Sequence, residues 1–198
     1  INDLDLYMRD ISRRDEIIEF LQIYFKEEFF VSNNCVTFRR KGVGRKIWTV
    51  QLITRFSGTA EDIFKDFDFT ITNGAYCFKD KQFTFGERFF TDLATRRLVY
   101  SGNSKYPICA LFRTKKYQKR GYYLPGSTVM HIGLSIVRLE IKTYKELKDQ
   151  LLGIDTMFLQ NLLNSEKYGD SLPVDYGAFV ADALEHLNVH TSEDDLDD

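Results

Sequence analysis

The stretch Asn2-Asp3-Leu4-Asp5-Leu6-Tyr7-Met8 decides the fold that we expect, because polar and apolar residues alternate along it. Such alternation is typical of a β-strand with one face toward a core. In a strand, Asp3 and Asp5 lie on the same face with their backbones about 7 Å apart. Their carboxylates are then close enough to hold one divalent cation or a pair of them. Two acids alone are equally compatible with ordinary solvated charges.

A third acid, Asp68, occurs in the apolar stretch Phe67-Asp68-Phe69-Thr70-Ile71. We expect a strand over residues 67–78, and a charge in such a strand is costly unless it is paired, lies at an edge or binds metal. Three carboxylates on strands that converge would suit two-metal phosphoryl or nucleotidyl transfer. Their hard oxygen ligands favour Mg²⁺ or Mn²⁺.

The remaining pattern predicts an α+β fold: a mixed sheet with flanking helices, followed by a helical C-terminal part. We expect strands at residues 29–39, 46–55 and 82–85, and helices at 13–28 (capped by Ser12), 60–66 (capped by Thr59), 87–97, 107–120, 144–152, 156–164 and 176–187. Residues 128–141 are rich in β-branched side chains and are compatible with a helix or a strand. The predicted organisation is an α+β core at 1–100, a helical region at 101–190 and an acidic disordered tail at 191–198.

Composition places the chain among soluble globular proteins. Its 198 residues are 43% hydrophobic and 28% charged, which excludes disordered, collagen-like and coiled-coil classes, and 15% are aromatic. Five acids lie between Glu193 and Asp198, and removing them from a net charge of −2 leaves +3. An anionic ligand is therefore compatible with the rest of the chain.

Cellular location is predicted from cysteine usage and hydropathy. Cys35, Cys77 and Cys109 are widely spaced, as expected in a reducing compartment. No apolar run is long enough to cross a bilayer, so we predict a cytoplasmic protein with no membrane partner. Because the chain opens at Ile1 and not at Met, we expect further residues upstream.

These motifs resemble the polymerase-β-like nucleotidyltransferase superfamily. Asn2 to Leu6 looks like its DxD strand. Asp68 to Ile71, followed by Ala75-Tyr76, resembles the RDFTINALAY strand in the head domain of the bacterial poly(A) polymerase and CCA-adding tRNA nucleotidyltransferase branch. The resemblance continues to about residue 123 through Phe90, Asp92-Leu93, Arg97-Leu98, Pro107, Leu111 and Gly121.

The resemblance implies that Asp3, Asp5 and Asp68 ligate the metal. Two departures concern specificity: Phe67 stands where the family has Arg, and the arginines of its nucleotide-selecting EDxxR-type helix fall on Cys109 and Phe112. Specific CCA addition is therefore not implied. The family also has a Gly-Gly or Gly-Ser turn before the DxD strand to hold the triphosphate, so we expect either that such a turn lies upstream of Ile1 or that the protein is not a conventional transferase.

A basic stripe is predicted on the helix that begins at Pro107. Arg113, Lys116 and Arg120 recur there at helical spacing, with tyrosines interleaved. Such a stripe suits triphosphate or RNA backbone, with Tyr117, Tyr122 and Tyr123 placed for stacking. A solvated helix face is the alternative. The basic loop at residues 39–46 has the same two readings.

The leading hypothesis is a Mg²⁺- or Mn²⁺-dependent nucleotidyltransferase that moves a nucleoside monophosphate from an NTP to a hydroxyl, with tRNA or another RNA as acceptor. Asp3 and Asp5 would hold metal, Asp68 would complete the site and assist deprotonation, and Arg113, Lys116 and Arg120 would bind phosphate. One alternative is a non-catalytic nucleotidyltransferase-like scaffold. Another is an RNA-binding protein that needs no metal.

Overall fold

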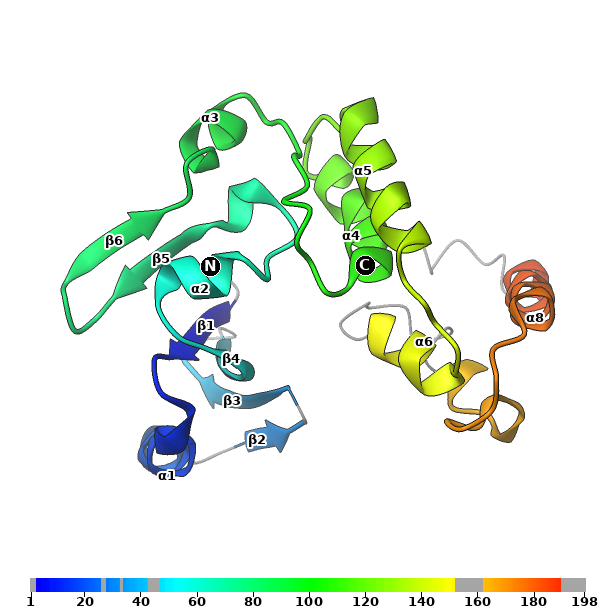
Figure 1. Ribbon diagram of the computed structural model, residues 1–198. Coiled ribbons are helices and arrows are strands. Elements are labelled where there is room, and N and C mark those ends of the chain that lie inside the picture. Colours follow the sequence, from blue (N-terminus) through cyan, green and yellow to red (C-terminus); the bar gives the residue numbers. More distant parts are fainter. Residues whose placement is uncertain (1–2, 26–27, 33, 43–46, 152–161, 190–198) are drawn as a thin grey trace. The chain divides into compact units, whose positions relative to one another are not determined.

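The computed structural model describes residues 3–25, 28–32, 34–42, 47–151 and 162–189 (Figure 1). The chain forms two units. The first comprises residues 1–66 and 74–86, and the second comprises residues 67–73 and 87–198. The α+β class is confirmed, with a mixed sheet and flanking helices followed by a run of helices.

A four-stranded sheet forms the first unit. Its strands are β1 (Asp3–Met8), β2 (Glu28–Val31), β3 (Cys35–Lys41) and β4 (Ile47–Ser57), in the order β1-β4-β3-β2. The pair β1–β4 is parallel and the other pairs are antiparallel. The stretch predicted as one strand at 29–39 is two strands, because a turn held by Ser32, whose hydroxyl donates to the Cys35 carbonyl, reverses the chain.

Helix α1 (Arg14–Tyr24) packs against one face of this sheet. The alternating apolar residues of the strands and the inner face of the helix form a shared core: Met8, Leu21, Val36, Phe38, Val50 and Leu52. Asp10, and not Ser12, caps the chain before α1, since its carboxylate accepts the Ser12 amide across a 3-10 turn. The helix also ends at Tyr24, four residues before the predicted end.

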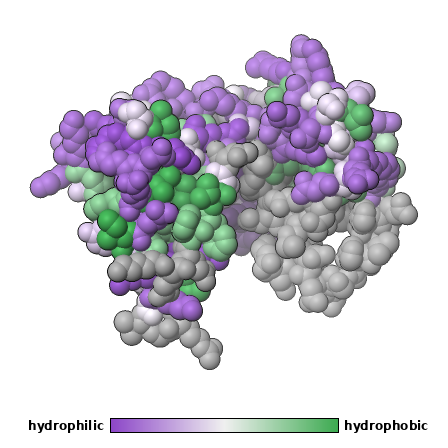
Figure 2. Space-filling model, turned by 90° about the horizontal axis from the view of Figure 1, so that it is seen from below, coloured by the Kyte–Doolittle hydropathy of each residue, from purple (hydrophilic) through white to green (hydrophobic). Residues whose placement is uncertain are grey.

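Two smaller elements complete the first unit. Helix α2 (Ala60–Phe64) begins at the predicted cap, where Thr59 and Asp62 form a reciprocal capping box. Strands β5 (Gly74–Cys77) and β6 (Gln82–Phe85) form a separate antiparallel hairpin. Apolar side chains also reach the surface of the first unit (Figure 2). Those of α1 and β2 include Phe20, Ile23, Phe29, Phe30 and Val31.

The second unit is helical. Its helices are α3 (Phe89–Ala94), α4 (Pro107–Lys119), α5 (Gly126–Val137), α6 (Tyr144–Gln150) and α8 (Tyr176–Val189). The ambiguous stretch at 128–141 is thus a helix over most of its length. After α4, Gly121 takes a φ of +83°, which glycine adopts without steric cost.

The segment 67–73 differs from its prediction as part of one strand over 67–78. Phe69 makes a single bridge to Tyr100, and residues Thr70–Thr72 form a 3-10 turn before β5 begins. The apolar alternation of this segment therefore does not reflect a sheet. It reflects packing of Phe69 and Ile71 in a core with Leu98 and Ile132.

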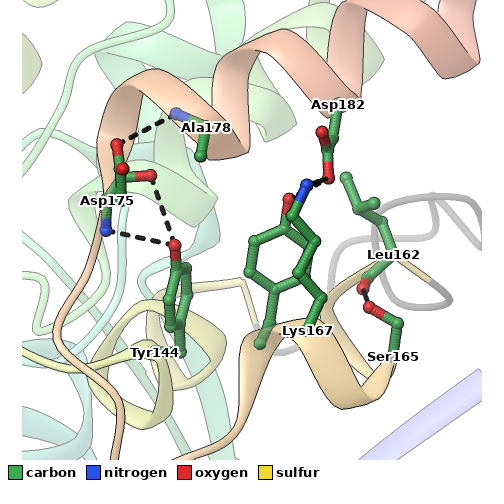
Figure 3. Close-up of polar contacts among 8 residues, drawn as sticks. Tyr144, Leu162, Ser165, Lys167, Asp175, Ala178 and Asp182 are labelled. Carbon is green, nitrogen blue, oxygen red and sulfur yellow. Dashed lines mark hydrogen bonds and ion pairs between the residues drawn. The ribbon is translucent and has the colours of Figure 1, made fainter.

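A second core in this unit joins α6, a 3-10 turn at Glu166–Tyr168 and α8 (Figure 3). The Tyr144 hydroxyl donates to the Asp175 carbonyl at 3.2 Å, and the Asp175 carboxylate accepts the Ala178 amide at the start of α8. Tyr168 is 1% exposed and donates to Asp182, which also pairs with Lys167. Burial, and then the Asp182 carboxylate, raise the pKa of Tyr168.

Two further predictions concern undescribed residues. Most of the helix expected at 156–164 and the acidic tail at 191–198 lie outside the residues that the structure describes. Within the described ranges, no helix combines the length and the apolar character needed to span a membrane.

Candidate active site

Asp3 and Asp5 lie on β1, which is an edge strand of the sheet. The register pairs Asp3 with Thr49 and Asp5 with Gln51 on the neighbouring strand β4. On the next strand, β3, Thr49 pairs with Arg39 and Gln51 pairs with Thr37. Register partners share a face of a sheet, so these polar residues line the same face as the two acids. We call this surface, carrying Asp3, Asp5, Thr37, Arg39, Thr49 and Gln51, the acidic face.

The acidic face is opposite the helix-covered face because side chains alternate along each strand. Leu6 follows Asp5 in the strand and points to the other face, where it packs against the core that β1 shares with α1. Asp3 and Asp5 are exposed, whereas Thr37, Thr49 and Gln51 are half-buried. The alternating sequence therefore predicts the position of the two acids correctly.

The environment of Asp5 disfavours its charged form. Partial removal of its carboxyl group from water, and then repulsion from Asp3, raise the pKa of Asp5. Carboxylate oxygens are the ligands that Mg²⁺ prefers, and Mg²⁺ in proteins is commonly held by one or two carboxylates together with waters and substrate phosphates. The donor set of Asp3 and Asp5 fits that pattern. In the described part of the chain, no group of three or more His, Cys, Asp or Glu side chains is arranged to hold a metal.

Asp68 belongs to the second unit, and its two carboxylate oxygens both have partners there. The Ser104 hydroxyl donates to Oδ1 at 2.6 Å, and the Arg113 guanidinium pairs with Oδ2. Asp68 is 7% exposed, so the costly burial of its charge is compensated by pairing. Metal binding by Asp68 stays a prediction.

The predicted basic stripe of α4 divides into two parts. Arg113 is half-buried against Asp68, whereas Lys116 and Arg120 are exposed. The Tyr117 ring packs 5.3 Å from the Phe69 ring, between ring centres, and Tyr122 packs against the same core. Tyr123 is 66% exposed. The exposed residues of this surface are therefore Lys116, Arg120 and Tyr123, and their phosphate and base contacts stay predictions.

Sequence reasoning missed a buried network around Asp92. This carboxylate is fully buried and accepts hydrogen bonds from the Thr70 hydroxyl at 2.6 Å and from two nitrogens of Arg88, at 2.7 and 3.0 Å. The four-residue spacing of Arg88 and Asp92 was the available signal, since such pairs meet on a helix. The network ties the turn after Asp68 to α3.

The sequence is similar to one protein family and to one phage protein. Residues 1–96 match the family described as Gabija anti-defense 2 family protein. Over 174 residues, the chain is 34% identical to Gabija anti-defense 2 of Bacillus phage SPbetaL7. That alignment covers 86% of this chain and 42% of the phage protein, so the chain spans less than half the length of this relative.

The structure is similar to solved tRNA-processing enzymes. A CCA-adding enzyme of Thermotoga maritima complexed with tRNA aligns with a TM-score of 0.50 and 13% identity, over 94% of this chain and 42% of that chain. A tRNA-processing enzyme in an apo form aligns with a TM-score of 0.50 and 11% identity, over 96% of this chain and 48% of that chain. At these identities the comparison establishes the fold. The chain has a nucleotidyltransferase-like fold, with an acid pair on the face of its sheet opposite α1.

Proposed function

We propose that this chain carries the metal site of a nucleotidyltransferase, which transfers a nucleoside monophosphate from an NTP to a hydroxyl acceptor on RNA. The observation that carries the proposal is the pair Asp3 and Asp5, side by side on the acidic face of a nucleotidyltransferase-like sheet. The similarity of the fold and the chemistry of the two carboxylates are separate observations, and both support metal-dependent nucleotidyl transfer. A tRNA acceptor is part of the proposal because the similar enzymes process tRNA.

In this proposal, Asp3 and Asp5 would hold Mg²⁺ or Mn²⁺. A bound ion of this kind neutralises phosphate charge and promotes attack by a hydroxyl. Thr37, Thr49 and Gln51 offer hydroxyl and amide donors to an anionic ligand on the same face. Lys116 and Arg120 offer exposed positive charge to an RNA backbone.

For Asp68 and Arg113 we propose a positioning role. Their ion pair holds the 67–73 segment against α4, and the Ser104 hydroxyl adds a second contact. Direct ligation of metal by Asp68 is the competing hypothesis. An Asp68→Asn variant separates the two, because ligation predicts a loss of metal affinity and a positioning role predicts a loss of stability alone.

The second candidate is a non-catalytic scaffold. Cys109 is buried in a core and Phe112 is 41% exposed at the positions where the resemblance places nucleotide-selecting arginines. A scaffold would use the fold for binding without transfer. The name of the phage relative, Gabija anti-defense 2, supports a role in countering a defence system under either candidate.

Transfer is tested with the full-length protein, radiolabelled NTPs, tRNA or total RNA, and Mg²⁺ or Mn²⁺. We expect Asp5→Asn to reduce incorporation by about 100-fold or more, the scale of removing a group that stabilises transition-state charge. Asp15→Asn is the matched control, because Asp15 is an exposed acid on α1 paired with Arg14. Wild-type rates in Asp5→Asn would contradict the catalytic proposal. Metal-dependent NTP binding without transfer would favour the scaffold.

A further inference from the structure

Arg39 is placed by the sheet register on the same face as the acid pair. It pairs with Thr49, and Thr49 pairs with Asp3, so two strand spacings separate the Arg39 and Asp3 backbones. Neighbouring strands lie about 4.8 Å apart, which puts the two backbones roughly 10 Å apart. Arg39 is exposed. A long cationic side chain and two carboxylates thus border the same stretch of sheet surface.

The positions between them are polar and uncharged. Thr49 lies between Asp3 and Arg39, and Gln51 and Thr37 continue the row that starts at Asp5. Each of these side chains is half-buried, so none of them projects far enough to block a ligand that lies across this face. Across β1, β4 and β3, the register therefore places negative charge first, hydrogen-bonding groups next and the positive charge of Arg39 third, and on β2 it pairs Arg39 with Glu28.

Phe30 supports the Arg39 side chain. It lies in the adjacent strand β2, in register with Thr37, and its ring centre is 5.4 Å from the Arg39 Cζ. A guanidinium over an aromatic face is favourably oriented, and the stacked geometry limits the positions that its nitrogens sample. The side chain is thereby kept near the sheet surface, on the β2 side of its strand.

We infer that Arg39 binds the polyphosphate chain of a nucleotide whose metal ion is held by Asp3 and Asp5. The inference rests on the proposed function. A divalent cation neutralises only part of the charge of a triphosphate, and guanidinium groups bind the remaining phosphate oxygens through paired hydrogen bonds. Arg39 supplies that group from within the first unit, two strands along the row that begins at Asp3.

The chain offers a matched control in the next residue. Arg40 is also exposed and carries the same charge, but it pairs with Trp48 and lies on the opposite face of β3. A change in net charge affects both variants equally. A site on the acidic face affects only Arg39.

The test is isothermal titration of the full-length protein with tripolyphosphate in the presence and absence of Mn²⁺, which reports binding without catalysis or a base. We expect metal-dependent binding by the wild type, loss in Asp5→Asn, about tenfold weaker binding in Arg39→Gln, and less than a twofold change in Arg40→Gln. Arg39→Lys should retain part of the affinity, because it keeps the charge and loses the planar fork. Thermal unfolding checks that each variant is folded.

The outcomes distinguish the two proposals. If Asp5→Asn loses binding while Arg39→Gln and Arg40→Gln behave alike, the role of Arg39 is overturned and the metal site stands. If the wild type shows no metal-dependent binding, or Asp5→Asn binds as the wild type does, the metal site itself is overturned.

Discussion

Asp68 and Asp92 are buried carboxylates of the second unit, and each is compensated by an arginine. Asp92 pairs with Arg88 four residues earlier, which a helical spacing makes visible in the sequence. Asp68 pairs with Arg113, 45 residues later, a contact that only the folded chain reveals. The residues Phe67 and Phe69 correctly indicate that a charge between them needs a partner. They do not indicate whether that partner is a metal or a guanidinium.

The Asp68–Arg113 pair predicts a stability effect at the residue scale. Arg113→Met leaves the buried Asp68 carboxylate with the Ser104 hydroxyl as its remaining partner. Breaking a fully buried pair costs about 3–5 kcal/mol, but the Arg113 side chain is 41% exposed, so we expect about 2 kcal/mol. Urea unfolding measures the loss. The double variant Asp68→Asn, Arg113→Met should recover part of it, and an unchanged midpoint in Arg113→Met would contradict the pairing.

At the scale of elements, helices with clear end signals were predictable and long-range packing was not. Helix α4 begins at Pro107 and the chain turns at Gly121, as their backbone preferences require. Strand β1 follows from its alternation. The 67–73 segment alternates in the same way, yet Phe69 and Ile71 are buried by Leu98 and Ile132 from far along the sequence. Periodicity identifies a buried face but not the element that buries it.

The turn before α4 depends on a glycine. Gly102 has a φ of +87°, and a Cβ there would lie 2.4 Å from the His131 ring on α5. Because His131 is exposed and can move, the backbone conformation sets the cost, and we expect Gly102→Ala to lower the free energy of unfolding by about 1–2 kcal/mol. Gly126→Ala is the control, since nothing lies within 4 Å of its Cβ position at the start of α5. Equal denaturant midpoints for the two variants would refute this account.

The capping box of α2 predicts a pH dependence. Hydrogen bonds from Lys65 and then Thr59 lower the pKa of Asp62 from 3.8 to about 2. A lowered pKa means that the charged group stabilises the folded chain above about pH 4, and that this contribution is lost as the pH falls toward 2. Asp62→Asn keeps an acceptor for Thr59 but removes the charge. Its thermal midpoint should lie below that of the wild type at pH 7, and the difference should shrink as the pH falls toward and below 2. A constant difference would contradict the assignment.

At the scale of the whole molecule, the two units are interleaved in sequence. The chain leaves the first unit after residue 66, returns at 74 and leaves again after 86. The division into an α+β core at 1–100 and a helical region after it stays a prediction. The sequence pattern alone does not show that residues 67–73 pack with Leu98 and Ile132. Net charge, in contrast, can be predicted without the fold. It is +3 when the five final acids are left out, whatever structure the chain adopts.

RNA binding is the prediction that belongs to this scale, because it depends on exposed cations of the folded chain. If Lys116 and Arg120 contact backbone phosphates, each contact releases counterions, and the slope of log affinity against log salt falls by about 0.7 per contact for single strands. Lys116→Gln and Arg120→Gln should each weaken tRNA binding and flatten that slope by about this amount. Lys142→Gln is the control, because Lys142 is exposed in the same unit and pairs with Glu140. Fluorescence anisotropy across a salt series measures all three. An equal flattening in Lys142→Gln would show that net charge, and not the α4 surface, attracts the RNA.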